Sequence, residues 1–171
     1  MPVLTTDRLR LDELTDADLD DVAAMVADPA VMRFYPAPLD RTGAQRLIDR
    51  NRARYTELGF GLWAVRTHAG EFVGDCGLTM QHVDGRDEVE VGYHLRTAAQ
   101  GHGYAAEAAR ACVQHAHQRG IERVVAIVDH ENLSSQRVAL RAGLLLESVL
   151  DHGGRSTHLY ATTVEGPGPD E

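Results

Sequence analysis

The feature that most constrains this chain is a pair of glycines, Gly101 and Gly103, at the start of an alanine-rich stretch. In a helix beginning near Gly103, small or apolar residues recur at i, i+3, i+4, i+7, i+8 and i+11 and form one stripe. They are Ala105, Ala108, Ala109, Cys112, Val113 and Ala116. Small side chains allow such a helix to pack closely on a sheet. Its free N–H groups and the positive end of its dipole then lie at the glycines, where an anion binds well.

Glycine suits an anion-binding loop for two reasons. Gly101 and Gly103 have no side chain to block a phosphate, and they permit backbone torsions that turn several N–H groups the same way. A plain glycine turn into a helix is the alternative interpretation. The strand expected before the loop and the small-residue helix after it favour the anion site.

The first half of the chain predicts one strand, two helices and a meander. Residues 9–14 alternate apolar and polar side chains as a half-buried strand does, and residues 15–28 follow as a helix with Thr15 as candidate N-cap. A second helix is expected over residues 42–58, ended by Gly59. Three strands joined by short turns are then expected to pair antiparallel, over residues 59–67, 71–83 and 87–97.

The second half of the chain alternates helix and strand. After the helix that begins near Gly103, a short apolar run over residues 122–130 predicts a buried strand, and residues 132–143 predict another helix. Residues 144–152 and 155–163 predict a closing hairpin around Gly153 and Gly154.

These elements predict an α+β fold, with a mixed, mostly antiparallel central sheet of about seven strands flanked by about four helices. A length of 171 residues fits one ordinary domain with its own core. We expect that domain over residues 1–163 and a flexible tail over residues 164–171, which are polar and rich in Gly and Pro.

Charge and composition exclude several classes of partner. The 26 acidic residues against 17 basic ones give a net charge of -9, so we expect no nucleic-acid partner; a cationic substrate suits the chain better. No apolar run approaches the roughly 20 residues of a membrane span, and the first residues lack a targeting pattern, which predicts a cytoplasmic protein. Cys76, Cys112 and the histidines lack metal-ligand spacing, so no metal is expected. A homodimer is compatible with the sequence, which holds no feature that argues for one.

The glycine loop also matches a dinucleotide-binding fingerprint. Residues 101–106 satisfy G-x-G-x-x-A, and Asp129 ends the next strand, where a ribose-binding acid would lie. In dinucleotide folds the fingerprint directly follows its strand, whereas residues 96–100 intervene here. The motif also begins past mid-chain and leaves no room for repeated βαβ units.

Several short motifs occur in order along nearly the whole chain. Residues 100–105 read Gln-Gly-His-Gly-Tyr-Ala, and others cover residues 6–11, 90–93, 104–108 and 132–135. Together they resemble the GCN5-related N-acetyltransferases, the GNAT superfamily, and within it the branch of the ribosomal-protein alanine acetyltransferases. The order of the expected elements is similar to that family's as well.

This resemblance implies an acyltransferase that moves an acetyl group from acetyl-coenzyme A to an amine. The acceptor would be a protein N-terminus or a small-molecule amine, and acetyl-CoA would be a co-substrate with no metal. In the family the loop amides hold the cofactor's pyrophosphate. The cofactor-binding residues that the resemblance implies are Leu95, Arg96, Gln100, Gly101, His102, Gly103, Tyr104, Ala105, Asn132 and Ser135.

Candidate catalytic residues lie on the third strand of the meander. Its period-two alternation places Glu90, Gly92 and His94 on the face opposite the core. Gly92 has no side chain to fill the space between Glu90 and His94, so an amine can approach a carboxylate base there directly or through water. Glu90 is the first candidate for the base and His94 the second, and a solvated sheet face with ordinary charges is the alternative.

The leaving thiolate needs a proton, and residues 135 and 139 are the positions where a proton donor is expected. By resemblance, Ser135 lies near the coenzyme sulfur and is a candidate acid; helix capping together with Asn132 is its alternative role. Many family members carry a tyrosine acid four residues before the glycine found here at 143, and this chain has Ala139. That departure favours a second hypothesis, a non-catalytic acyl-CoA sensor.

Overall fold

The computed structural model describes residues 1–152 and 154–163. The predicted tail over residues 164–171 and Gly153 of the predicted hairpin turn lie outside the described residues. The strands are β1 (Leu4–Thr5), β2 (Leu9–Glu13), β3 (Leu62–Thr67), β4 (Phe72–Val83), β5 (Arg86–Leu95), β6 (Val124–Asp129), β7 (Leu144–His152) and β8 (Arg155–Thr162). The α-helices are α1 (Leu19–Ala27), α2 (Arg41–Leu58), α3 (Tyr104–Gln118) and α4 (Leu133–Arg141).

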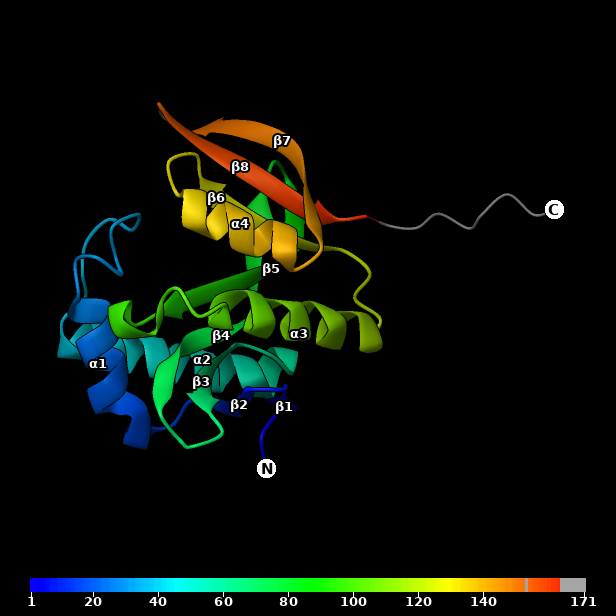
Figure 1. Cartoon of the computed structure of the whole chain (residues 1–171). Coiled ribbons are helices and arrows are strands. Elements are labelled where there is room, and N and C mark those ends of the chain that lie inside the picture. The colour runs from blue at the N-terminus through cyan, green and yellow to red at the C-terminus, as the bar shows by residue number, and fades with distance from the viewer. Residues whose placement is uncertain (153, 164–171) are drawn as a thin grey trace.

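The described strands form one mixed sheet in the order β1-β2-β3-β4-β5-β6-β8-β7 (Figure 1). Neighbouring strands are antiparallel except for β5 and β6, which are parallel. This arrangement confirms the predicted fold class, and the short β1 brings the sheet to eight strands. It does not fit the dinucleotide alternative, whose sheet is mostly parallel.

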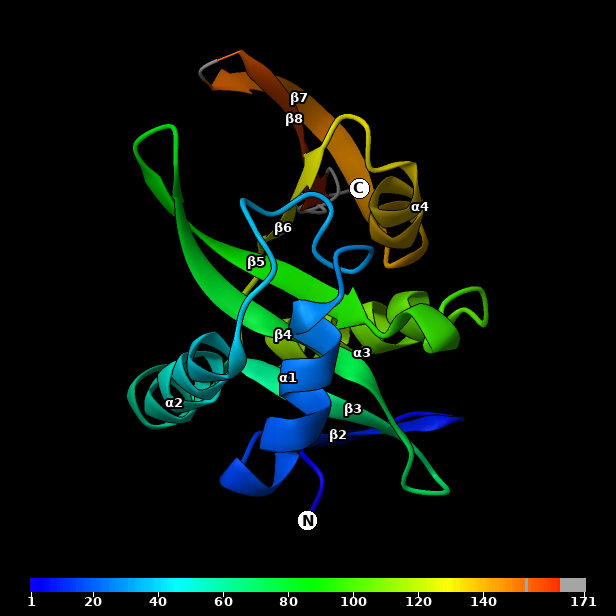
Figure 2. The same cartoon turned by 90° about the vertical axis from the view of Figure 1, so that its left-hand side faces the viewer.

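The helices cover the two faces of the sheet in pairs. α1 and α2 pack on one face, which Figure 2 shows from the front, around a cluster that includes Ala64 of β3. α3 and α4 pack on the other face, against Trp63 and Val65 of the same strand. Successive side chains of a strand point to opposite faces, so β3 contributes to both cores.

The small-residue stripe of α3 is buried as the sequence predicts. Ala108, Ala109, Cys112 and Ala116 have no exposed surface. α3 therefore lies close on β4 and β5, and its first turn lies beside the end of β5. Within the described residues, no helix has the length and apolar character needed to cross a membrane.

The parallel strands β5 and β6 pair over only a short distance. Val89 lies opposite Val124 and Glu90 opposite Val125, and the pairing ends there. β5 continues to Leu95, while the rest of β6 pairs with β8 on its other side. The two strands therefore separate beyond Glu90, and the separation positions the site described next.

Candidate active site

A cavity of about 600 Å³ occupies the place where β5 and β6 separate. Glu90 and His94 of β5 line it together with Ile127 of β6 and Ser135 of α4. The loop between α1 and α2 closes one side with Tyr35. Because these groups come from elements on both faces of the sheet, the cavity joins the α3–α4 side to the α1–α2 side.

The glycine loop has the torsions that an anion-binding turn requires. Gly101 has φ +82° and Gly103 has φ +80°, both in the left-handed region that favours glycine. Gly103 is the N-cap of α3, and Glu107 is the first residue after it whose N–H donates within the turn, to the Gly103 carbonyl at 3.1 Å. Among the described residues, the N–H groups of residues 101–106 have no partner, so they are free to bind an anion.

The structure brings most of the predicted cofactor residues to one region. Those that line the cavity directly are Leu95, Gln100, Ala105, Asn132 and Ser135. Residues 101–104 form the adjoining loop and the start of α3. Arg96 differs, because its guanidinium donates to the Phe72 carbonyl at 3.2 Å and is absent from the cavity wall.

Glu90 combines burial with access to the cavity. Burial raises the pKa of its carboxyl from 4.5 to about 7, although the Ile127 backbone, the Thr79 hydroxyl and the charge of His94 all act to lower it. A carboxyl group with a pKa near 7 is half ionised at neutral pH and suits a general base. Glu88, on the same face, instead pairs with Arg123 at 3.0 Å.

The raised pKa of Glu90 predicts a pH-dependent stability difference. The folded protein binds the Glu90 proton more tightly than the unfolded chain does, so this contribution is present below pH 4.5 and is lost as pH rises through about 7. We expect Glu90→Gln to be more stable than wild type by about 3 kcal/mol at pH 8.5 and nearly equal in stability at pH 4.5. Urea unfolding at both pH values checks this; equal stability at pH 8.5 would contradict it.

His94 is held by a second buried acid, Asp75 of β4. The register of β4 and β5 pairs these two residues, and His94 Nδ1 lies 2.7 Å from Asp75 Oδ1. Desolvation lowers the pKa of His94, but the charge and hydrogen bond of Asp75 and the charge of Glu90 together raise it above 6.5. A raised pKa reduces the share of the neutral imidazole, which is the form that acts as a base, and this favours Glu90 for that role.

The loop between α1 and α2 brings an aromatic ring to His94. The rings of Tyr35 and His94 have centroids 4.9 Å apart. Arg33 and Phe34 of the same loop also line the cavity, as do Gln81 of β4 and Arg155 of β8. These side chains line the same cavity as Glu90 and His94 and are the candidates for contacts with an acceptor.

The hydroxyl groups of two other cavity residues, Tyr93 and Ser135, contact each other. The Tyr93 hydroxyl lies 2.8 Å from Ser135 Oγ and donates to the Ser135 carbonyl at 2.8 Å. Asn132 accepts from the Ser135 N–H at 3.1 Å and caps α4, so both predicted roles of this segment, capping and access to the cavity, are compatible. Ala139 is fully buried in α4.

Asp75 and Tyr93 belong to the site but were not predicted as site residues. The signal for Asp75 was a single acid within the otherwise apolar, glycine-containing stretch of β4, residues 72–78. Tyr93 was assigned to the core face by alternation, and it does pack against the core. Its hydroxyl nevertheless reaches the cavity because β6 has already separated from β5 at this point.

The fold and site together place a helix N-terminus that is free to bind an anion beside a buried carboxyl group, at the point where two parallel strands separate. The chain belongs to the GNAT acetyltransferase family: the acetyltransferase (GNAT) domain matches residues 8–145. The predicted family is thereby confirmed.

Individual relatives agree with this assignment. The uncharacterized protein YkkB of Bacillus subtilis (strain 168) is 33% identical over 144 residues, which cover 82% of this chain and 84% of that protein. The uncharacterized N-acetyltransferase YoaA of the same organism is 29% identical over 156 residues, covering 87% and 86%. The crystal structure of an acetyltransferase from Agrobacterium tumefaciens str. C58 is 26% identical, with a TM-score of 0.82 and 95% of each chain covered.

More distant solved structures share the fold. A ribosomal L7/L12 alpha-N-protein acetyltransferase RimL in complex with coenzyme A is 17% identical, with a TM-score of 0.77 and 96% and 99% of the two chains covered. The microcin C7 self immunity acetyltransferase MccE in complex with acetyl-CoA and AMP is 18% identical, with a TM-score of 0.75 and 93% and 94% covered.

Proposed function

We propose that this protein is an N-acetyltransferase that transfers the acetyl group of acetyl-CoA directly to an amine. The observation that carries the proposal is the convergence of Glu90, with a pKa near 7, and the Tyr93–Ser135 hydroxyl pair on one cavity beside the free N–H groups of residues 101–106. Each feature supplies one requirement of acyl transfer: a base, a proton donor and an anion site.

The proposed step forms a C–N bond and breaks the C–S bond of the thioester. Glu90 accepts a proton from the acceptor amine, which attacks the carbonyl carbon from the α1–α2 side of the cavity. The tetrahedral oxyanion then collapses and expels the CoA thiolate, which takes a proton from the Tyr93–Ser135 pair. Glu90 releases its proton to solvent and the hydroxyl pair regains one from solvent, so both return to their starting states. Direct transfer fits the two cysteines, because Cys76 and Cys112 are buried in the core and burial raises the pKa of the Cys76 thiol.

The residues at the mouth of α3 fit the cofactor. The N–H groups of residues 101–106 and the helix dipole would hold the diphosphate of CoA. Asn132 and Ser135 at the start of α4 would flank the pantetheine arm and the sulfur. When bound, acetyl-CoA supplies the activated acetyl group. RimL and MccE, which share the fold, have been solved in complex with coenzyme A and with acetyl-CoA, and this supports CoA as the ligand.

For the acceptor, we propose a chemical class, an amine. RimL is named for an alpha-N-protein acceptor, whereas MccE is named for self immunity to microcin C7. The Glu90 carboxyl on the cavity wall suits an amine that must lose a proton, from either a protein N-terminus or a small molecule; Asp129 on the same wall pairs with Arg155 at 3.5 Å. Tyr35 and Phe34 would pack against the part of the acceptor next to its amine.

The test is release of free CoA from acetyl-CoA, followed with a thiol reagent, against a panel of peptide N-termini, aminoglycosides, polyamines and amino acids. The proposal expects at least one amine to stimulate release well above the rate of hydrolysis. Tight binding of acetyl-CoA with no turnover on any amine would favour the sensor hypothesis, which rested on Ala139. The Tyr93 hydroxyl argues against the sensor, because it offers the proton that the missing tyrosine would have donated.

Asp75→Asn is expected to shift the pH profile of the reaction. Without the charge and hydrogen bond of Asp75, the pKa of His94 falls, and a His94 that is less often charged lowers the pKa of Glu90 less. The acidic limb of kcat/KM then moves to higher pH. A shift of one unit from pKa 7 lowers kcat/KM at pH 7 about fivefold, with recovery near pH 9. A uniform loss at all pH values would instead indicate that Asp75 is only structural.

A further inference from the structure

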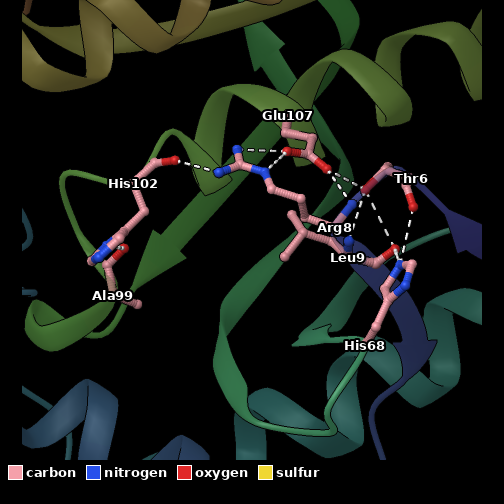
Figure 3. Close-up of polar contacts among 7 residues, drawn as sticks. All are labelled: Thr6, Arg8, Leu9, His68, Ala99, His102 and Glu107. Carbon is pink, nitrogen blue, oxygen red and sulfur yellow. Dashed lines mark hydrogen bonds and ion pairs between the residues drawn. The ribbon is translucent and has the colours of Figure 1, made fainter.

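The turn between β1 and β2 reaches across to the glycine loop through Arg8 (Figure 3). Arg8 Nη1 donates to the His102 carbonyl at 2.8 Å, and Arg8 Nε donates to Glu107 Oε2 at 2.6 Å. The same guanidinium lies 4.8 Å from the centre of the Tyr104 ring. One side chain thus contacts the loop and the first turn of α3 at once.

Further hydrogen bonds tie the turn that carries Arg8 to Glu107 and to His68. Glu107 accepts from the Thr6 hydroxyl at 2.6 Å and from the Arg8 backbone N–H at 3.0 Å. His68 Nε2 lies 3.1 Å from the Thr6 carbonyl and 3.3 Å from the Leu9 carbonyl. The turn therefore has little freedom to move relative to α3, and the Arg8 guanidinium is held over the loop.

The bond to His102 matters because glycines lie on both sides of this residue. Glycine adopts either sign of φ at similar cost, so the peptide planes next to Gly101 and Gly103 are easily reoriented. In a trans peptide the carbonyl and the N–H point in opposite directions. Holding the His102 carbonyl toward Arg8 therefore aims the Gly103 N–H away from Arg8.

The direction away from Arg8 leads toward the proposed cofactor site. α3 lies between the β1–β2 strands and α4 in both views (Figures 1 and 2). Arg8 approaches from the strand side, whereas Ala105 and Val138 line the cavity where α3 faces α4. The peptide that Arg8 holds thus presents its N–H on the cavity side.

Arg8 also balances a charge at the mouth of α3. Desolvation would raise the pKa of Glu107, but its bonds to Thr6 and Arg8 and the Arg8 charge together lower it, so the carboxyl is ionised. An unpaired carboxylate in the first turn would repel a diphosphate. Paired with Arg8, it leaves the helix N-terminus attractive to anions.

We propose that Arg8 is a positioning residue for the CoA diphosphate: it pre-orients the His102–Gly103 peptide so that the loop is ready to bind. This inference rests on the proposed function, because it concerns the same cofactor site. Arg8 is not among the residues that line the cavity with Glu90 and the Tyr93–Ser135 pair, so its effect is expected in cofactor affinity alone.

The test is CoA binding by calorimetry, with kcat and KM for acetyl-CoA measured alongside. Arg8→Ala is expected to raise the Kd of CoA about tenfold and the KM in parallel, with kcat at saturation within about twofold of wild type. Arg10→Ala is the matched control, since Arg10 lies in the same strand region and pairs with Asp12 at 3.1 Å, with no contact to the loop. It is expected to bind CoA like wild type.

A double variant separates positioning from simple charge balance. Arg8→Ala combined with Glu107→Gln removes the unpaired carboxylate but leaves the loop peptide unheld, so CoA binding is expected to stay as weak as in Arg8→Ala. Binding restored to the wild-type level, or an unchanged Kd in Arg8→Ala itself, would overturn the proposal.

If Arg8→Ala does not fold, Arg8→Lys takes its place. The single ammonium group of lysine cannot bond to both His102 and Glu107 as the guanidinium of Arg8 does, so weaker CoA binding is again expected. Wild-type affinity in Arg8→Lys would overturn the proposal. Failure of wild type to bind CoA would count against the proposed function instead.

Discussion

Glu90→Gln is expected to lower kcat/KM for the acceptor amine by about 10²- to 10⁴-fold. The exchange keeps the size and polarity of the side chain but removes the group that accepts the amine proton. The acidic limb of the wild-type pH profile, which reflects ionisation of Glu90 with its pKa of about 7, should disappear with it. Steady-state kinetics between pH 5.5 and 9 check both expectations.

The matched control for this variant is Glu88→Gln. Glu88 lies on the same strand face but is paired with Arg123, outside the cavity. Its exchange should leave the pH profile in place. CoA affinity should be unchanged in Glu90→Gln, because the carboxyl is far from the diphosphate loop. A Glu90→Gln enzyme with the wild-type profile would mean that water or another group deprotonates the amine.

Tyr93→Phe is expected to lower kcat about 10²-fold, with a small effect on KM. Burial raises the pKa of the Tyr93 phenol, so the phenol stays protonated across the working range, and its contact with the Ser135 hydroxyl connects it to the leaving thiolate. Ser135→Ala should cost about the same. Because the two hydroxyls act as one donor, the double variant should be no slower than either single variant. Effects that multiply in the double variant would contradict a shared donor.

Much of the fold could be predicted because local pattern and tertiary structure agree. The helix expected over residues 42–58 spans Arg41–Leu58 and ends at Gly59, whose φ of +76° is the left-handed torsion predicted for such a cap. The meander and the closing hairpin appear where alternation placed them, and the α3 stripe appears where helical spacing placed it. The pairing of β6 with β8 rather than β7 could not be predicted, since it depends on long-range packing.

The sequence could predict only those site residues that the alternation within a single strand identifies. Period two placed Glu90 and His94 on one face, and the structure places both on the cavity wall. Asp75 was missed because its contact with His94 depends on the register of β4 and β5, which no local pattern specifies. Tyr93 was missed because the separation of β5 from β6, not alternation, gives its hydroxyl access to the cavity. The catalytic and cofactor-binding roles of all these residues remain predictions.

The central claim is that CoA lies with its diphosphate on the α3 loop and its sulfur where β5 and β6 separate. The position of CoA in a crystal structure of the complex tests this most directly. The account predicts diphosphate oxygens bonded to N–H groups within residues 101–106 and the sulfur next to the Ser135 hydroxyl. CoA bound elsewhere, with those N–H groups unoccupied, would contradict it.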